Sequence, residues 1–166
     1  DNRYCFYHRA IFESLRRPVM QNLDFGENLI LLSTRMVKGE PWKHIFVSKE
    51  LAEAIILSSK TSCSAYAFPL YIYESSKNNL FHKAKRENFS KNFLQEFYKN
   101  IGGKIPEKDV FNFIYALFHS SIYRTRFASL LKRSFPKIIF PKSKELTERM
   151  GELGAKLIKT HLLEID

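Results

Sequence analysis

The sequence has 166 residues, of which 45% are hydrophobic and 27% are charged. This composition excludes a disordered chain, and no apolar run approaches the roughly 18–20 residues of a membrane-spanning helix. The net charge of +10 makes a polyanion such as nucleic acid the first partner to consider.

Aromatic and β-branched residues predict a small antiparallel or mixed sheet in the first half of the chain. The predicted strands are 3–8, 28–37, 44–48 and 65–73. Pro69 lies within the last of them, which indicates a bend or the edge of a sheet.

Two short helices are expected among these strands. The first, 12–23, is limited by Pro18, because a proline disfavours helical backbone in the residue before it. The second, 48–59, has Ser48 as its N-cap and acidic residues in its first turn, where they suit the helix dipole. The polar and basic stretch 74–88 follows as an expected connection.

The second half of the chain has helical periodicity. A helix over 89–100 is closed by Gly102 and Gly103, and a second begins near Pro106 and runs to 120 with one buried apolar stripe. Ser120 and Ser143 are N-caps for further helices at 121–134 and 144–163, separated by an extended segment, 135–141, with a proline near each end. In the last helix, Leu146, Met150, Leu153 and Leu157 form the predicted apolar side, with Gly151 and Gly154 beside it for close helix approach.

These elements predict an α+β fold. A sheet-containing lobe with short helices would comprise residues 1–75, and a helical lobe residues 76–166. The first lobe carries nine Lys/Arg against eight Asp/Glu, and the second eighteen against nine. Residues 110–144 contain seven Lys/Arg and no acid, which favours a polyphosphate partner, with a solvated face kept for solubility as the alternative.

Signals for catalysis are missing from the sequence. It has no P-loop, no Gly-x-Ser-x-Gly, no His-Glu-x-x-His and no Asn-Pro dipeptide, and its histidines show no metal-ligand spacing. Cys5 and Cys63 also fit no ligand spacing, so we expect reduced thiols in a cytoplasmic protein. Because the chain begins with Asp1 rather than Met, we expect a piece of a longer polypeptide.

The stretch "DVFNFIYALFHSSIYRTRFASLLKRSFPKIIFP", 109–141, resembles the C-terminal specificity region of single-polypeptide restriction–modification enzymes, the type ISP group and its type IIG relatives. "DNRYCFYH", "RRPVMQNL" and "SSKTSCSAYAFPLYIY" resemble further motifs of these enzymes in the expected order. Ser121 departs from the usual proline, and Arg133-Ser134 from the usual acid before Phe-Pro. The matching positions are Phe111, Ile114, Tyr115, Ala116, His119, Ser120, Tyr123, Arg124, Phe135, Pro136 and Pro141.

The resemblance implies a target-recognition domain that binds double-stranded DNA. Its parent enzyme, a system of bacterial defence, would carry an adenine-N6 methyltransferase and an endonuclease, as partner domains of the same polypeptide. Those domains would use S-adenosylmethionine and Mg²⁺, with ATP where a helicase motor is present. We expect no cofactor, metal or catalytic site in this segment itself.

Two tasks are expected of such a domain, and each has candidate residues. Phosphates would be held by the basic stretch and bases would be read by polar loops of the first lobe, on 33–43 and 58–62. Trp42 could stack or wedge, although a lone tryptophan is more often a packing anchor. The phosphate candidates are Arg124, Arg126, Lys132, Arg133, Lys137 and Lys142, and the base-reading candidates are Arg35, Lys38, Lys43, Lys60 and Thr61.

Two alternatives remain open at this point. One is a module whose basic face docks an acidic protein or a sister domain of the same polypeptide. The other is a catalytic nuclease fragment with an irregular site.

Overall fold

The computed structural model describes residues 19, 21–23, 27–50, 52–58, 60, 63–75 and 83–164. The expected strand 3–8, most of the expected helix 12–23, Cys5 and Thr61 lie outside these residues. Of that helix, Gln21–Leu23 is described and forms the 3₁₀ helix η1.

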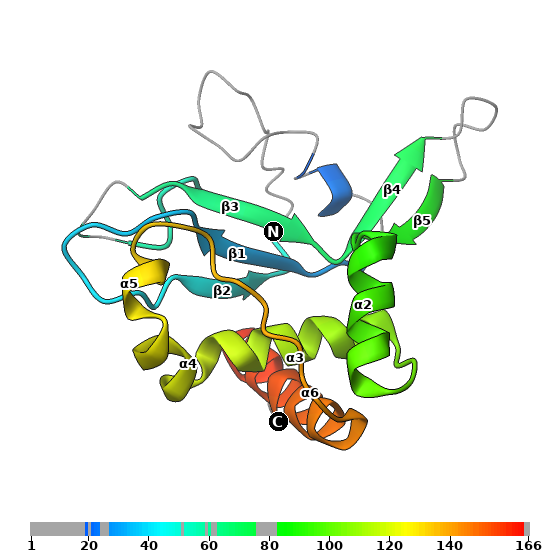
Figure 1. Ribbon diagram of the computed structural model, residues 1–166. Helices are drawn as coiled ribbons and strands as arrows, with labels where there is room; N and C mark the ends of the chain where they lie inside the picture. The colour runs from blue at the N-terminus through cyan, green and yellow to red at the C-terminus, as the bar shows by residue number, and fades with distance from the viewer. Residues whose placement is uncertain are drawn as a thin grey trace.

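An antiparallel three-stranded sheet forms the N-terminal part of the fold (Figure 1). The strand order is β2-β1-β3, and each strand is shorter than the predicted one. Residues 28–29 and 35–37 of the strand expected at 28–37 lie outside the observed strand β1. The bounds are β1 (Ile30–Thr34), β2 (Ile45–Ser48) and β3 (Ala65–Pro69).

The expected strand 65–73 divides at Leu70 into two strands that belong to different sheets. β3 ends at Pro69, which pairs with Ile30 at the edge of the first sheet, so the predicted bend and edge are confirmed. β4 (Tyr71–Ser75) pairs with β5 (Lys83–Glu87) in a two-stranded antiparallel sheet. The expectation of a simple connection at 74–88 is therefore wrong, because most of its described residues extend and pair with β4.

The expected helix at 48–59 is also wrong. Ser48 is the last residue of β2, where it pairs with Ile30, and its Oγ accepts a hydrogen bond from Glu50 N at 3.0 Å in a local turn. The described residues 52–58 form turns, and Ala52 and Leu57 are buried against the outer face of the sheet. Tertiary burial therefore overrides the local helix signal.

Five helices follow, and all are found where the sequence predicts helical periodicity. Gly102 closes the first helix with φ 74°, as predicted, and Ser90, which was not predicted as a cap, accepts a hydrogen bond at its Oγ from Phe93 N at 3.2 Å. The predicted helix 121–134 divides at Phe127, whose φ of −106° and ψ of 16° are not helical. The bounds are α2 (Lys91–Ile101), α3 (Glu107–His119), α4 (Ser121–Arg126), α5 (Ala128–Leu131) and α6 (Lys144–His161).

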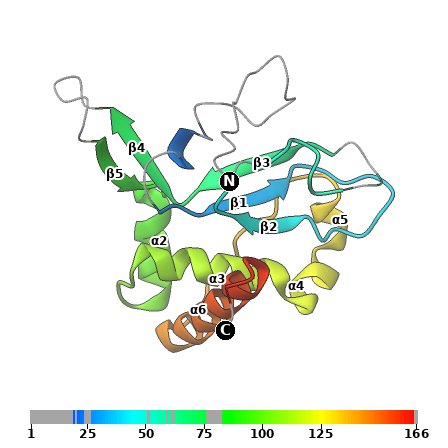
Figure 2. The same cartoon turned by 180° about the vertical axis from the view of Figure 1, so that it is seen from behind.

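α3 is the centre of the fold, between the sheet on one side and α6 on the other (Figures 1 and 2). Eight of its thirteen residues are buried, so the buried surface of this helix is wider than the single apolar stripe that the sequence predicted. One hydrophobic cluster joins Leu31, Ile45 and Val47 of the sheet to side chains of α2, α3, α5 and α6. Residues 135–140 form no helix or strand and pack on this cluster through Ile138 and Phe140, while their extended conformation stays a prediction.

The contact of α6 with α3 confirms one prediction and corrects another. A Cβ at Gly154 would lie 1.9 Å from the backbone oxygen of Asn112, so only glycine permits this approach. The predicted apolar side is only half buried, since Met150 and Leu157 pack on the main cluster, whereas Leu146 and Leu153 are 49% and 58% exposed. The buried side is displaced around the helix and consists of Thr147, Gly151, Gly154 and Ile158.

The α+β fold class is thus confirmed, with antiparallel sheets followed by packed helices. The division into lobes at residues 75 and 76 stays a prediction. No described helix has the length and apolar character to cross a bilayer.

Candidate nucleic-acid interface

A hollow of about 640 Å³ lies between the loop that follows β1 and the helical segment α4–α5. It brings together candidates from both predicted groups: Lys43 on the loop, and Arg124 and Lys132 on the helical side. A backbone hydrogen bond from Val37 N to Lys132 O, 3.2 Å long, ties the two sides together. We call the two sides the loop wall, residues 35–44, and the helical wall, residues 121–133.

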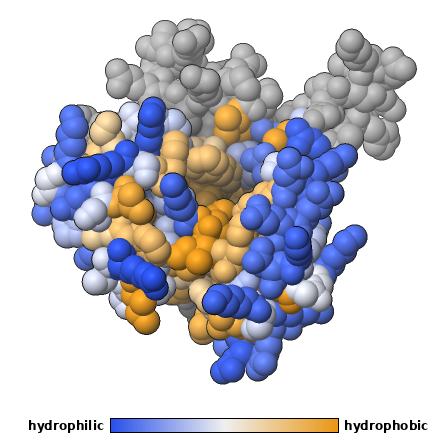
Figure 3. All heavy atoms as spheres, in the orientation of Figure 1, coloured by the Kyte–Doolittle hydropathy of each residue, from blue (hydrophilic) through white to orange (hydrophobic). Residues whose placement is uncertain are grey.

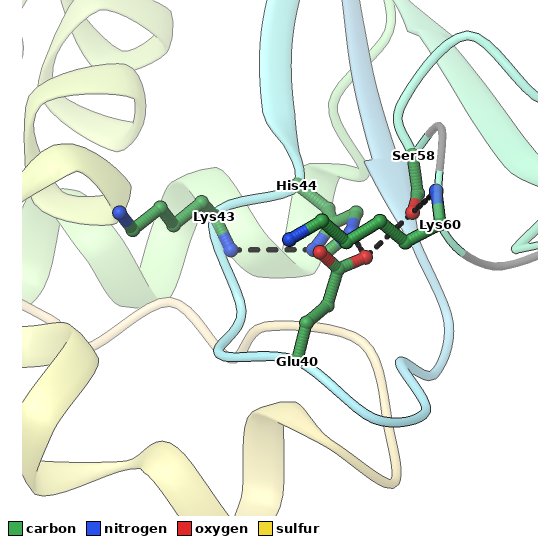
Figure 4. Close-up of polar contacts among 5 residues, drawn as sticks. All are labelled: Glu40, Lys43, His44, Ser58 and Lys60. Carbon is green, nitrogen blue, oxygen red and sulfur yellow. Dashed lines mark hydrogen bonds and ion pairs between the residues drawn. The ribbon is translucent and has the colours of Figure 1, made fainter.

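Polar contacts hold the loop wall (Figure 4). Oε1 of Glu40 accepts hydrogen bonds from Ser58 Oγ at 2.5 Å and from His44 Nε2 at 3.1 Å. Nδ1 of the buried His44 accepts from Lys43 N at 3.2 Å, which fixes the neutral tautomer with its proton on Nε2. The hydrogen bond from Ser58, together with His44 and the nearby Lys60 ammonium, lowers the pKa of the Glu40 carboxyl.

The base-reading candidates on this wall are exposed. Arg35 directly follows β1, Lys38 precedes Gly39 (φ 78°), and Lys43 lies beside Trp42. Lys60 is exposed, and its side chain approaches the Glu40 carboxylate. Lys43 alone among these described candidates lines the hollow.

Arg124 anchors the helical wall. Its Nε donates to Phe118 O at 2.7 Å, its NH2 group donates to His119 Nδ1 at 3.2 Å, and its guanidinium lies 5.7 Å from the centre of the Trp42 ring. Burial lowers its pKa. These contacts cap the end of α3, so Arg124 has a structural task whether or not it also meets a phosphate.

Two buried donors next to Arg124 have no partner among the described residues. Nε2 of His119 carries the proton, because Nδ1 accepts from Arg124, and it meets no acceptor there. Nε1 of Trp42 is likewise unpaired, although Trp42 itself is 4% exposed and packs edge-on against Phe118, as expected for an anchor. Burial, followed by the Arg124 charge, lowers the pKa of His119 to about 4, so the ring is neutral near pH 7.

The other phosphate candidates are exposed, and in the described part of the chain no carboxylate pairs with them. They continue from the helical wall along the segment 135–141 and its end. The carbonyl of Lys137 accepts from Tyr123 Oη at 2.8 Å, which fixes this segment against α4, and burial raises the pKa of Tyr123 to about 12. Lys132 lines the hollow, and the others do not: Arg126, Arg133, Lys137 and Lys142.

Hydrophobic residues gather in the middle of the face in Figure 3. A second hollow of about 350 Å³ lies between the sheet, α3 and the segment 135–138, and no charged side chain lines it. It therefore lacks the chemistry that attracts a polyanion. No group of three metal-ligating side chains occurs among the residues that the structure describes.

The polar network of the loop wall and the unpaired Nε2 of His119 were not predicted from the sequence. Glu40 and His44 are close in sequence, but Ser58 reaches them only through the fold. His44 and His119 both lack metal-ligand spacing in the sequence, but both ring nitrogens of His44 have hydrogen-bond partners, whereas Nε2 of His119 has none among the described residues. Its place before the capping Ser120 gave no chemical signal.

Comparison with known proteins identifies the fold and the family. The whole sequence, residues 1–166, matches the family described as the Type ISP C-terminal specificity domain. None of the curated proteins matches.

Three solved structures are similar, each with a TM-score above 0.5. The ATP-dependent Type ISP restriction–modification enzyme LlaBIII bound to DNA has a TM-score of 0.71 at 21% identity, over 89% of this chain and 9% of that one. The DrdV–DNA complex has 0.67 at 22% identity, over 96% and 16%. A nuclease-deletion mutant of the Type ISP enzyme LlaGI, in complex with a DNA substrate mimic, has 0.57 at 24% identity, over 83% and 10%. The chain thus spans a small part of each of these proteins.

Proposed function

Because the chain belongs to the Type ISP C-terminal specificity domain family, we propose that it recognises a specific sequence in double-stranded DNA. In this proposal it directs an adenine-N6 methyltransferase and an endonuclease of the same polypeptide to their target, in the cytoplasm. The similar LlaBIII, DrdV and LlaGI structures contain DNA or a DNA mimic, which supports the choice of partner. S-adenosylmethionine, Mg²⁺ and ATP would serve those other domains.

The single observation that carries the proposal is the meeting of Lys43 and Lys132 at one hollow. A recognition domain must hold phosphates and read base edges at the same time, so its two groups of side chains must face one duplex. Here the loop wall and the helical wall are joined by the hydrogen bond from Val37 to Lys132. Movement of either wall would therefore move the other.

The helical wall and the segment after it suit the backbone of DNA. Lysine and arginine side chains that contact phosphates release counterions, so affinity falls with salt by a slope of about 0.9 for each phosphate. Arg126, Lys132, Arg133, Lys137 and Lys142 are exposed and free of ion pairs among the described residues, so each is available for such a contact. Arg124 has internal hydrogen bonds and is the weakest member of the group.

The loop wall suits base reading. Arginine and lysine can pair with guanine in the major groove, with roughly 1–3 kcal/mol of discrimination for a good bidentate contact. Arg35, Lys38 and Lys43 project from a loop whose backbone is fixed by Glu40 and His44, and Lys60 lies beside it. Thr61 stays a candidate from the sequence alone.

The test is selection of bound duplexes from a random-sequence pool by the 166-residue chain. Replacing Lys43 and Arg35 by alanine should weaken or change the selected motif. Replacing Lys132, Arg133 and Lys137 by glutamine should leave the motif unchanged while reducing the salt slope by about 2.7. An unchanged motif in the first variant would reject the loop assignment, and failure of the wild-type chain to bind any duplex would reject the proposal in favour of a protein-docking role.

A further inference from the structure

A pocket of about 250 Å³ opens at the other end of α3, away from the loop wall. It lies among the start of β1, the β4–β5 pair, the first turns of α3 and the last turns of α6. Lys108 and His119 mark the two ends of α3, and at about 1.5 Å of rise per residue they lie roughly 16 Å apart. The pocket is therefore separate from the candidate interface.

Lysines from four parts of the chain line this pocket. Only Lys49 has an ion-pair partner among the described residues, Glu164 at 2.5 Å. Nζ of Lys85 lies 3.7 Å from the centre of the Tyr71 ring, and no described carboxylate pairs with Lys108 or Lys159. The charged residues of the lining are Lys49, Lys85, Lys108, Lys159, Glu27 and Glu164.

An amide on the wall of the pocket adds a hydrogen-bonding group to these charges. Asn112 is 5% exposed and lines the pocket, yet its carboxamide has no hydrogen bond to any residue in the described part of the chain. Asn28, equally buried and also in the lining, is fully satisfied by the backbones of Asn22, Leu29 and Tyr71. Neither polar atom of this carboxamide is among the fully buried unpaired atoms of the described residues, so the amide reaches the open space of the pocket, where its NH₂ group is available to a ligand that accepts hydrogen bonds.

We propose that this pocket binds a phosphate group, held by Lys85, Lys108 and Lys159 and by the amide of Asn112. A phosphate offers several acceptor oxygens and negative charge, which match an NH₂ donor surrounded by ammonium groups. Two sources share this chemistry: the backbone of a duplex that extends past the candidate interface, and a free phosphate-bearing molecule. The site does not depend on sequence-specific DNA recognition.

The test uses the 166-residue chain and inorganic pyrophosphate as the probe, with sodium chloride added to keep the ionic strength constant. Isothermal titration calorimetry should show saturable binding. The double variant K108Q/K159Q should lose affinity by about tenfold or more, because two charge-assisted contacts are removed. The control K91Q/K99Q removes two exposed lysines of α2 that do not line the pocket, and its affinity should stay within about twofold.

A second variant, Asn112→Asp, places a negative charge next to the bound group and should abolish binding, with folding checked by circular dichroism. If this variant does not fold, the lysine pair decides. Absence of saturable binding, equal losses in K108Q/K159Q and K91Q/K99Q, or a larger loss in K132Q/R133Q would each overturn the proposal.

Competition distinguishes the two sources. If saturating pyrophosphate weakens duplex binding by the wild-type chain but not by K108Q/K159Q, the site holds a DNA phosphate. If duplex binding is unchanged, or if the chain binds no duplex, while pyrophosphate still binds, the site holds a free phosphate-bearing molecule. The failure of DNA recognition and the failure of this site are thus separate results.

Discussion

The two walls of the hollow that contains Lys43 and Lys132 are fixed in different ways. Polar contacts fix the loop wall, in which the carboxylate of Glu40 accepts from Ser58 and His44. The helical wall rests on the main hydrophobic cluster through the buried side chains of Tyr123 and Leu131. A loop held by polar contacts tolerates new side chains between its fixed points, whereas a helix packed on the core tolerates few changes on its buried face.

The largest expected effect is a loss of stability when the packing of α6 on α3 is disturbed. Gly154→Ala would place a Cβ 1.9 Å from the Asn112 oxygen and force α6 away from α3. We expect a loss of about 3 kcal/mol in the free energy of unfolding, measured by urea denaturation. Gly103→Ala is the control, since its Cβ would meet only Lys144 Cδ at 3.6 Å, and a similar loss there would contradict this explanation.

The next effect is a pH dependence at His119, the last residue of α3, which lines the hollow beside the helical wall. The pKa of His119 is about 4 in the folded chain and 6.5 in its ordinary state, so the unfolded chain binds the proton first. The contribution of the neutral His119 ring to the free energy of unfolding is fully present above pH 6.5. It is lost as the pH falls toward 4, by on the order of 2 kcal/mol given the partial exposure of the ring. Urea denaturation at pH 7 and pH 4.5 should show a smaller pH-dependent loss in His119→Asn than in the wild type.

Arg124 and Arg126 provide a third and sharper comparison. Arg124→Gln removes the donors to Phe118 O and His119 Nδ1 and should reduce stability by about 1–2 kcal/mol. Arg126→Gln should change stability by less than about 0.5 kcal/mol and reduce the salt slope of DNA binding by about 0.9. If Arg124→Gln instead reduced the slope with no loss of stability, Arg124 would be a phosphate ligand and not a structural one.

The smallest effect is expected in the loop wall. Glu40→Ala leaves Nε2 of the buried His44 and the Ser58 hydroxyl without this acceptor, for a loss of about 1 kcal/mol. Loss of a carboxylate beside Lys60 should also raise affinity for random duplexes while weakening motif selection. Glu50→Ala, at an exposed position outside the loop, is the matched control for both the denaturation and the binding measurements.

Local signals predicted much of the fold. The caps at Ser120 and Ser143, the stop at Gly102 and the periodicity of 106–120 depend on residues within one or two turns, and the structure agrees with them. The failures at 48–59 and 74–88 both come from contacts distant in sequence: Ser48 and Lys85 adopt strand backbone through pairing with Ile30 and Tyr73, and Ala52 and Leu57 are buried against the sheet. Pairing between segments distant in sequence overrode the local preference.

The candidate interface was predictable only as separate pieces. The charge distribution indicated Lys132, and the composition of the loop indicated Lys43. Neither signal indicates that both residues line one hollow. Their proximity depends on the fold, in which Val37 N donates to Lys132 O. The family resemblance included Arg124, but its hydrogen bonds to the end of α3 become visible only when α4 turns back on that helix. Residues that share a surface without sharing a segment leave no pattern in one sequence.

The two hydrogen bonds that attach the loop wall to the rest of the chain limit how that loop can be exchanged between related proteins. In this chain the loop is attached through Glu40, which accepts from the Ser58 hydroxyl, and through Val37 N, which donates to the Lys132 carbonyl. A transplanted loop would need both of these partners, and both lie outside the transferred segment. Substitutions at Arg35, Lys38 and Lys43 leave these attachments unchanged. Under the proposed function, a new preference should therefore be engineered more readily by replacing those three side chains in place than by grafting a foreign loop of different length.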